Sequence, residues 1–385
     1  MPDVPPPGMF TIDLCDWWNQ RLAEAPAATF DGVTRNLAPG EWRLTGALDA
    51  LQFAPGKTIL DVRQVRVVVD NAIQFTGYVT PVASGVGGLD IVDADIGPQF
   101  TLSGADEWSV IAQRVAYPTP GSEPPWADAW DIRTGQASSV AAEYLLYNLG
   151  PYALTNREMV GIGVVDGHAG TTGEWSARLQ PLDQLVTRIC HDGGIVCRLG
   201  TAFTGGITIT LVAPEDRSRS TVLSDQGGLT AIQQTRTTPT STFVIAGGQG
   251  ALTSRTFATS AEPFADHWER RETFTDQSSL STVGELQQAA DTVRALALPT
   301  LTVIASITDD AAAAIIYLAD YDVGDTIAIE IGDVRYPVIV EAVTIHVSPD
   351  RAMIRPVFGS ASPNIVTGLV RDVAAISTRL DTQIT

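Results

Sequence analysis

The sequence predicts a β-rich α+β fold, and three patterns lead to this prediction. Stretches near both ends alternate apolar and polar residues with the two-residue period of a half-buried strand, most clearly Thr326–Ile331, whose three isoleucines share one face. Apolar residues at helical spacing occur mainly between these ends, as in Ser138–Leu149. After residue 362 they recur at alternating spacings of three and four, which is typical of a coiled-coil seam.

The first part of the chain is predicted to consist of strands joined by tight turns. Met1–Gly8 is rich in proline and is expected to be an extended arm. Asp70-Asn71 favours a hairpin, because both residue types tolerate the backbone of a tight turn. The elements predicted here are the strands Trp42–Leu48, Asp61–Asp70, Ala72–Val82, Leu89–Val92 and Phe100–Leu102, and a helix over Asp106–Arg114.

An α+β unit over Pro125–Pro214 is predicted between the β-rich parts. Its helix Leu182–Ile189 carries an apolar stripe and is followed by the stop signal Asp192-Gly193-Gly194. Arg255–Asp276 is charged and has no clear period, so an irregular crossing is expected there. The other elements predicted in the middle of the chain are the helices Ser138–Leu149 and Leu280–Leu296, and the strands Ile195–Leu199, Ile207–Val212, Ile232–Thr235, Phe243–Ile245 and Leu301–Ile307.

The last β-rich part follows a short helix predicted over Ala311–Leu318, which Asp309-Asp310 is expected to cap. Its hairpin Ile327–Val340 matches Val65–Val79 in pattern, which is a weak internal repeat. Because such hairpins are common, convergence explains the match about as well. Three linked antiparallel strands, typical of a barrel or sandwich, are predicted here: Thr326–Ile331, Tyr336–Val347 and Ala352–Phe358.

The C-terminal seam predicts self-association. A helix this short is marginal alone in water, and its β-branched seam residues favour more than two strands. The alternative is an ordinary helix that lies on its own barrel. The residues of the seam are Val366, Leu369, Val373, Ile376 and Leu380.

The overall charge limits the function classes. The chain of 385 residues has a net charge of −20, and Lys57 is its only lysine. Nucleic-acid binding through neutralised phosphates needs clustered basic residues, so it is excluded, whereas an acidic wall that repels DNA is compatible. Met1–Phe10 lacks the basic and apolar regions of a secretory signal, and no apolar run approaches the roughly 20 residues of a membrane span. A soluble protein made in the cytoplasm is therefore expected.

The cysteines and histidines indicate no catalytic or metal site. Three scattered cysteines do not make a disulfide framework; Cys190 and Cys197 could meet, but free buried thiols are the more common state. Cys190-His191-Asp192 is contiguous at a helix end, whereas a catalytic Cys and His usually meet only in the fold. Metal-ligand spacing is absent from the four histidines, which are His168, His191, His267 and His346.

Two further motifs favour structural roles. Asp93 and Asp95 would share one face of a strand, but the ligand positions of a calcium loop are missing, so a solvated face is expected. Gly247–Gly250 follows a strand without the Lys-Ser/Thr ending of a phosphate-binding loop, which favours a tight turn. We therefore expect no enzyme, cofactor or metal.

Four motifs in order give the chain a family resemblance over roughly Trp42–Gly359. Together they resemble the tail hub proteins of long-tailed actinobacterial phages, also called minor tail or baseplate hub proteins, which are similar to the hub of contractile tails. The motifs are Phe100-Thr-Leu-Ser-Gly-Ala-Asp with the helix after it, Leu179-Gln-Pro-Leu-Asp-Gln-Leu, Val244-Ile-Ala-Gly-Gly-Gln-Gly and Tyr321-Asp-Val-Gly-Asp-Thr-Ile.

This resemblance implies a homotrimeric hub in the virion, at the phage tail tip. Each subunit would supply two tube-like β-barrel domains, so three subunits would match the six-fold tail tube, and the C-terminal seam would be the trimer interface. The implied partners are the distal tail protein ring and tail tube, the tape measure protein, tip or fibre proteins, and genomic DNA that passes without specific binding. No membrane insertion is implied. The expected domains are an N-terminal barrel (1–117), an inserted α+β domain (118–228), a connecting strand/helix domain (229–310), a C-terminal barrel (311–361) and a coiled-coil helix (362–385).

Two other functions compete with the hub. A receptor- or carbohydrate-binding tail tip protein would use Trp126, Trp130 and Trp175 as exposed stacking platforms. A cell-wall-degrading tail enzyme is disfavoured by the motif search. Larger relatives of the resembled family continue into such modules, so here those tasks are expected to belong to another protein.

Overall fold

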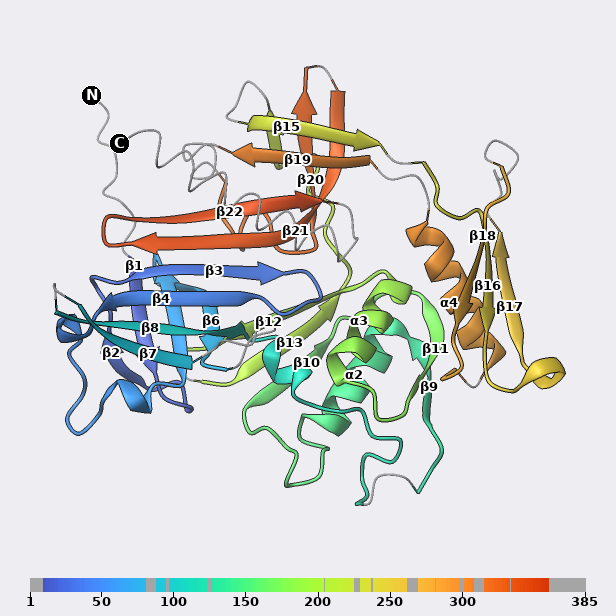
Figure 1. Cartoon of the computed structure of the whole chain (residues 1–385), viewed down its shortest axis with the longest axis horizontal. Helices are drawn as coiled ribbons and strands as arrows, with labels where there is room; N and C mark the ends of the chain where they lie inside the picture. Colours follow the sequence, from blue (N-terminus) through green and yellow to red (C-terminus); the bar gives the residue numbers. More distant parts are fainter. Residues whose placement is uncertain are drawn as a thin grey trace. The chain divides into compact units, whose positions relative to one another are not determined.

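The chain forms two compact, β-rich units. The computed structural model describes residues 10–80, 88–94, 97–123, 127–203, 205–224, 229–236, 238–261, 269–280, 282–297, 301–307, 315–332 and 334–359. One unit comprises Met1–Pro214 with Ala342–Arg355, and the other Glu215–Glu341 with Pro356–Thr385 (Figure 1). Strands dominate both units and helices are few, which confirms the β-rich fold class.

The first unit is built on one antiparallel sheet. Its strand order is β21-β3-β4-β8-β6-β5-β1-β2, with β7 paired to β8 and β22 paired to β21. The part of β21 that belongs to the first unit begins at Ala342, and its residues Ala342–Val347 pair with β3. The strands are β1 (Phe10–Cys15), β2 (Arg21–Glu24), β3 (Thr29–Arg35), β4 (Glu41–Ala47), β5 (Gln64–Val69), β6 (Ala72–Tyr78), β7 (Gly88–Ala94), β8 (Gly97–Asp106), β21 (Val334–Ser348) and β22 (Arg351–Gly359); the 3-10 turns η1 (Leu48–Ala50) and η2 (Ile59–Asp61) follow β4.

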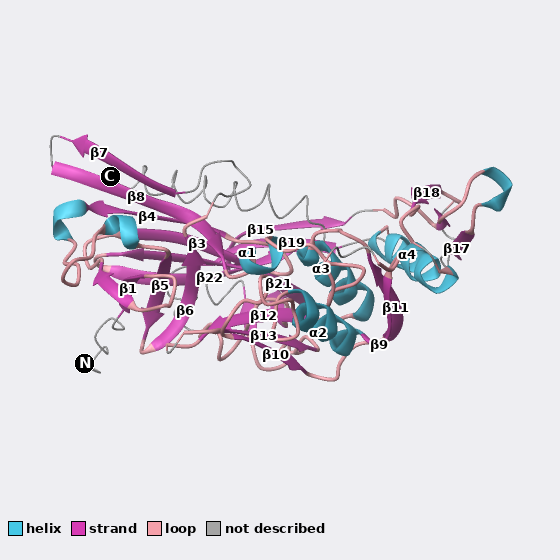
Figure 2. Cartoon of the chain, turned by 90° about the horizontal axis from the view of Figure 1, so that it is seen from below, coloured by secondary structure: helices cyan, strands magenta, loops and turns pink. Residues whose placement is uncertain are grey.

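This sheet is strongly curved (Figure 2), and side chains from strands far apart in its order meet. Phe30 on β3 packs against Phe75 on β6 with ring centroids 5.2 Å apart, although β4 and β8 lie between these strands in the sheet order. Trp42 on β4 stacks on Phe30 at 6.3 Å. Strong curvature is what brings such distant strands together. The pairings among the described residues leave the sheet open, so a closed barrel stays a prediction.

The turn at Asp70-Asn71 has the predicted form. The φ angles of the two residues are 51° and 62°, which is the left-handed conformation that a two-residue hairpin turn needs between β5 and β6. The helix predicted over Asp106–Arg114 is wrong in its extent. Helix α1 covers only Ser109–Ala112, because β8 continues to Asp106 and pairs there with β4 and β6.

An α+β module completes the first unit. Its buried core contains Tyr144 and Trp175 between the two helices and the strands, together with Leu185 and Ile209. The predicted helix that begins near Leu182 is present, and Gly194 ends it with a φ of 66°. The module consists of β9 (Asp131–Gln136), α2 (Ala137–Asn148), β10 (Ile162–Asp166), β11 (Thr172–Ala177), α3 (Leu182–Gly193), β12 (Val196–Thr201) and β13 (Ile207–Val212), paired as β10-β13-β12 and β11-β9.

The described part of the second unit contains three groups of paired strands. The strand β20 lies between β14 and the Val334–Ile339 part of β21, β15 pairs with β19, and β16 lies between β17 and β18. Helix α4 lies along the β17-β16-β18 sheet (Figure 1). The elements are β14 (Val222–Ser224), β15 (Leu229–Arg236), β16 (Phe243–Gly247), η3 (Leu252–Ser254), β17 (Phe257–Ala261), β18 (Glu272–Asp276), α4 (Val283–Leu296), β19 (Leu301–Ile307) and β20 (Thr326–Ile331).

Two predictions for the second unit need correction. The segment Arg255–Asp276 is not merely an irregular crossing, because it contains β17 and β18, whose outward phenylalanines and charged residues obscure the strand period. For the helix predicted over Ala311–Leu318, residues 311–314 and the capping pair Asp309-Asp310 lie outside the described residues. The rest is not helical: Leu318 has a φ of 67° and forms a turn.

Candidate functional site

The predicted trimer interface lies outside the described residues. Val366, Leu369, Val373, Ile376 and Leu380 all belong to the segment 360–385. The seam therefore stays a prediction.

The sequence Cys190-His191-Asp192 packs the end of α3. Cys190 is buried, and burial raises the pKa of its thiol well above the ordinary value. The Asp192 carboxylate accepts a hydrogen bond from Trp175 Nε1 at 3.0 Å, so it is engaged in packing. Partial desolvation also lowers the pKa of His191. Cys190 and Asp192 pack at the end of α3, His191 is exposed, and the described contacts give no nucleophile–base pair.

The three cysteines are free and buried, as expected. Burial raises the pKa of Cys15 to about 11 and that of Cys197 to about 12. Thiols with such pKa values hold their protons at neutral pH, and they behave as small apolar side chains.

The glycine run after β16 begins a wider turn than the tight one predicted, because Gly247 still belongs to β16 and the connection to β17 continues through η3. Gly250 has a φ of 105°. Arg255 holds the turn by donating to the carbonyl oxygens of Gly247 and Gly248 at 2.9 and 3.0 Å. Asp93 lies in β7, and Asp95 lies outside the described residues. Across the part of the chain that the structure describes, no three acidic, His or Cys side chains gather as a metal site would require.

A cluster of hydroxyl, carboxylate and imidazole groups lies where β10 meets α2, and the sequence did not reveal it. Ser138 and Ser139 each donate a hydrogen bond to the Asp166 carboxylate at 2.6 Å, and His168 Nδ1 lies 3.1 Å from the same carboxylate. Partial burial raises the Asp166 pKa, but the two serine hydrogen bonds outweigh it and leave a pKa below the ordinary value. The lowered pKa makes the Asp166 carboxylate a weak base, so it does little to activate the two serines as nucleophiles. The cluster ties the end of β10 to the first turn of α2 through side-chain hydrogen bonds.

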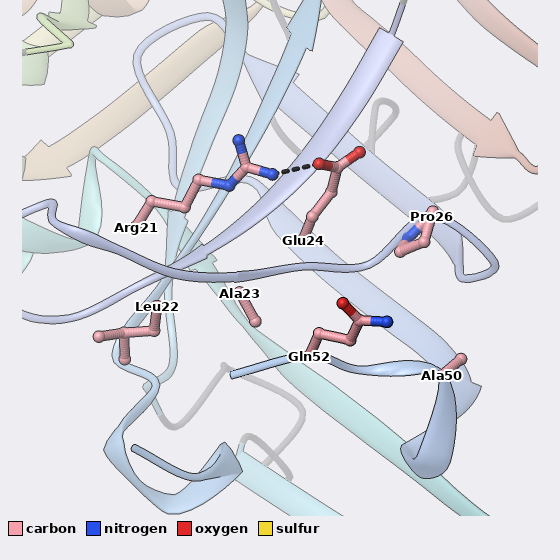
Figure 3. Close-up of a pocket in the computed structure, with 7 residues that line it drawn as sticks. All are labelled: Arg21, Leu22, Ala23, Glu24, Pro26, Ala50 and Gln52. Atoms are coloured by element: carbon pink, nitrogen blue, oxygen red, sulfur yellow. Dashed lines mark hydrogen bonds and ion pairs between the residues drawn. The ribbon is translucent and has the colours of Figure 1, made fainter. Parts of the chain in front are cut away.

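A shallow hollow of about 430 Å³ lies beside the edge strand β2 (Figure 3). In it, Arg21 forms ion pairs with Glu24 and, at 3.1 Å, with Asp13. These charges satisfy one another, so the hollow offers no convergent set of groups for a ligand. It is lined by Arg21, Leu22, Ala23, Glu24, Pro26, Ala50 and Gln52.

The most developed arrangement of polar groups in the first unit joins the curled sheet to the α+β module. Arg66 on β5 forms a buried ion pair with Asp13 on β1 at 2.7 Å, and its guanidinium lies 5.1 Å from the centre of the Phe203 ring. Glu107, which follows β8, accepts a hydrogen bond from the Thr201 hydroxyl at the end of β12. Ion pairs and hydrogen bonds of this kind fix the position of the β12–β13 connection.

Two further hydrogen bonds connect the curled sheet with the α+β module. Together with the contacts of Arg66 and Glu107, they form what we call the joint. Asn19 Nδ2 donates to the Ala202 carbonyl at 2.9 Å, and the Thr187 hydroxyl donates to the Leu37 carbonyl at 3.0 Å. Burial raises the pKa of Glu107 to about 7 and the pKa of Asp106 well above its usual range. The joint is an arrangement for rigidity, and its residues contain no activated nucleophile.

Of the three tryptophans expected to form an exposed platform, the structure describes Trp130 and Trp175. Trp175 is buried in the module core, where its indole bonds Asp192, so the prediction that it is exposed is wrong. Trp130 is partly covered, with Arg178 5.5 Å from its ring centre. Trp126 lies outside the described residues.

The fold is that of phage tail proteins. The structure is similar to the prophage tail protein gp18 from Listeria monocytogenes EGD-e, with a TM-score of 0.56 at 10% sequence identity, covering 96% of this chain and 99% of that one. It is also similar to the tail protein from Neisseria meningitidis MC58 (TM-score 0.52, 13% identity, 91% and 97% covered). A third similar structure is the 43 kDa tail protein of prophage MuSo2 from Shewanella oneidensis. Its TM-score is 0.52 at 10% sequence identity, and the match covers 91% of this chain and 98% of that one.

Residues 29–360 match the family model described as Siphovirus ReqiPepy6 Gp37-like protein, and the chain belongs to that family. No significant relative was found among curated proteins. The family and the fold together confirm the prediction of a siphophage tail protein and thus of a virion component. Within the described ranges, every helix is too short or too polar to span a membrane.

Proposed function

We propose that this siphovirus tail protein is a homotrimeric hub, which joins the six-fold tail tube to the three-fold tail tip and lets DNA pass. The observation that carries the proposal is the curled sheet of the first unit, in a chain whose fold follows phage tail proteins over nearly its whole length. In this proposal, residues 1–117 and 311–361 form two tube-like barrels, so a trimer presents six. Residues 118–228 and 229–310 are the domains between them, and 362–385 is the coiled coil. The role is structural, without catalysis.

The charge of the chain supports the passage of DNA. Three copies at −20 each would surround the channel with a strongly negative field, which repels the phosphate backbone. DNA would then slide past without specific contacts during ejection. The role does not require a cofactor.

The proposed neighbours are the distal tail protein ring and tail tube on one side, with the tape measure protein, and tip or fibre proteins on the other. The hairpin of β7 and β8 suits a contact of this kind, because Ile91 and Val92 are exposed on β7. Apolar side chains on an exposed hairpin favour burial against another protein.

Mass photometry of the full chain tests the trimer. The expected particle has three times the chain mass of 40.9 kDa. The double substitution Val373→Asp with Ile376→Asp places charges in the seam and is expected to yield monomers. The matched control Thr378→Asp adds a charge beside the seam and should leave the trimer intact. A wild-type protein that stays monomeric at micromolar concentration would refute the proposal.

A further inference from the structure

The β17-β16-β18 sheet has two apolar faces, and α4 covers one of them. Val244, Ala246 and Ala258 point to α4 and are buried in one core with Leu286 and Ala290. The helix is also tied to the edge of the sheet, since Gln287 donates to the Thr259 carbonyl at 3.1 Å. One helix on one side of a three-stranded sheet leaves the opposite side to solvent.

The opposite side carries aromatic residues, and we name it the aromatic face. Because strand residues alternate, Phe257 and Phe274 point away from α4, and they are 52% and 53% exposed. Phe243 and Ile245 lie on the same side of β16, in register with β18, where Ile245 is opposite Phe274. The aromatic face is defined by Phe243, Ile245, Phe257 and Phe274.

Two arginines lie over the rings of this face. The Arg255 guanidinium is 5.9 Å from the centre of Phe257 and 5.4 Å from that of Phe274, and its ion pair with Asp276 fixes it there. The Arg270 guanidinium lies 3.9 Å from the centre of Phe243. Guanidinium groups over aromatic rings are frequent at the centres of protein interfaces.

The charge balance indicates which partner fits. The chain carries a net charge of −20, so most surfaces of two copies repel each other. On the aromatic face the charges cancel, because Arg255 pairs with Asp276 and Arg270 pairs with Glu272. Arg270 is still accessible to a further carboxylate, since its side chain is 61% exposed. A second copy supplies carboxylates in excess.

We propose that the aromatic face binds an acidic surface of a neighbouring copy of this chain and thus forms a second subunit contact besides the seam. The contact is heterologous: the face of one copy meets a different surface of the next, which is the form that closes a ring. This inference rests on the proposed trimer. It assigns to the middle of the chain a role in assembly that the C-terminal seam alone does not provide.

The test measures the assembly of the full chain by mass photometry over a concentration series. Phe257→Ser with Phe274→Ser is expected to raise the midpoint concentration of assembly at least tenfold. Arg270→Glu, a surface change that leaves the sheet core intact, is expected to raise it as well, and keeps the test valid if the double variant does not fold. The matched control is Val160→Ser, at a 75% exposed apolar residue of the first unit.

The outcomes separate the two proposals. If the wild type forms trimers and both variants assemble at the wild-type midpoint, the aromatic face is not a subunit contact, while the trimer stands. If Val160→Ser weakens assembly as much as the other variants, the effect is unspecific and the inference is likewise wrong. A wild type that stays monomeric throughout overturns both proposals.

Discussion

Glu107 is unusual for a glutamate because its side chain is buried. Its carboxyl group is buried between the sheet and the α+β module, where it accepts the Thr201 hydrogen bond beside the equally buried Asp106. Burial penalises the charged form and raises the Glu107 pKa to about 7 from its usual 4.5. Its negative charge also contributes to the raised pKa of Asp106, after burial itself.

The raised pKa predicts that stability falls as pH increases. The protonated carboxyl is favoured in the folded state, so its contribution is fully present below pH 4.5 and is lost as pH rises through about 7. At roughly 1.4 kcal/mol per pKa unit, the loss amounts to about 3 kcal/mol. Glu107→Gln removes this titration and should flatten the pH dependence of the unfolding free energy in urea between pH 5 and 8.

The contribution of Asp106 remains in the Glu107→Gln variant, so some pH dependence is expected to persist. The control is Glu143→Gln, which changes an exposed carboxylate paired with Arg133 in the same unit. Parallel pH profiles for wild type and Glu107→Gln would show that Glu107 is solvated and that the joint is looser than described.

At the scale of elements, the sheet depends on a close crossing of β6 and β8. A Cβ on Gly104 would lie 1.8 Å from the Tyr78 carbonyl oxygen, which belongs to the backbone and cannot rotate away. Gly104→Ala is therefore expected to destabilise the first unit by about 2–3 kcal/mol. Gly200→Ala on β12 is the control, because a Cβ there meets nothing within 4 Å, and its effect should stay within about 0.5 kcal/mol.

Urea unfolding monitored by circular dichroism compares the two glycine variants. Equal midpoints for Gly104→Ala and Gly200→Ala would mean that the strands can separate at little cost. The described close approach would then be wrong.

The sequence predicted an element well where one face of that element is exposed to solvent. The helices α3 and α4 and the hairpin at Asp70-Asn71 follow from spacing and turn chemistry alone. The strand β1 was not assigned, although Phe10, Ile12 and Leu14 alternate with polar residues over this short stretch. The buried charges Arg66 and Glu107 were missed because composition places such residues at the surface, and only the fold brings them partners.

The features of the candidate sites were likewise predicted only in part from the sequence. The sequence indicated correctly that Cys190 is a buried thiol, whereas the connection after Gly247 is wider than the tight turn predicted over Gly247–Gly250. It could not show the aromatic face, because Phe257 and Phe274 belong to two strands that were expected to be an irregular crossing. A surface made by neighbouring strands becomes visible only when their register is known.

At the scale of the whole molecule, charge governs assembly. Three chains of −20 repel one another, and salt screens this repulsion. The Debye length falls from about 30 Å at 0.01 M to about 8 Å at 0.15 M salt, so the trimer is expected to form at a lower protein concentration in the higher salt. Contacts that exclude water, as the proposed seam and the proposed contact at the aromatic face would, are screened much less.

Analytical ultracentrifugation at the two salt concentrations measures this effect. A trimer that dissociates on adding salt would mean that complementary charges, and not apolar contacts, hold the copies together. Guanidine chloride is unsuitable as the salt here because it also unfolds proteins.

Because β21 comes late in the chain, its pairing with β3 is delayed during synthesis. Its residue His346 bonds Asp31 on β3, 315 positions earlier in the chain. At about 5–20 residues per second, the ribosome delivers this partner roughly 15–60 s after β3 emerges. Until then the edge of β3 is bare and open to wrong pairing with other nascent chains. A chaperone that shields this edge would therefore raise the yield most when the message is translated slowly.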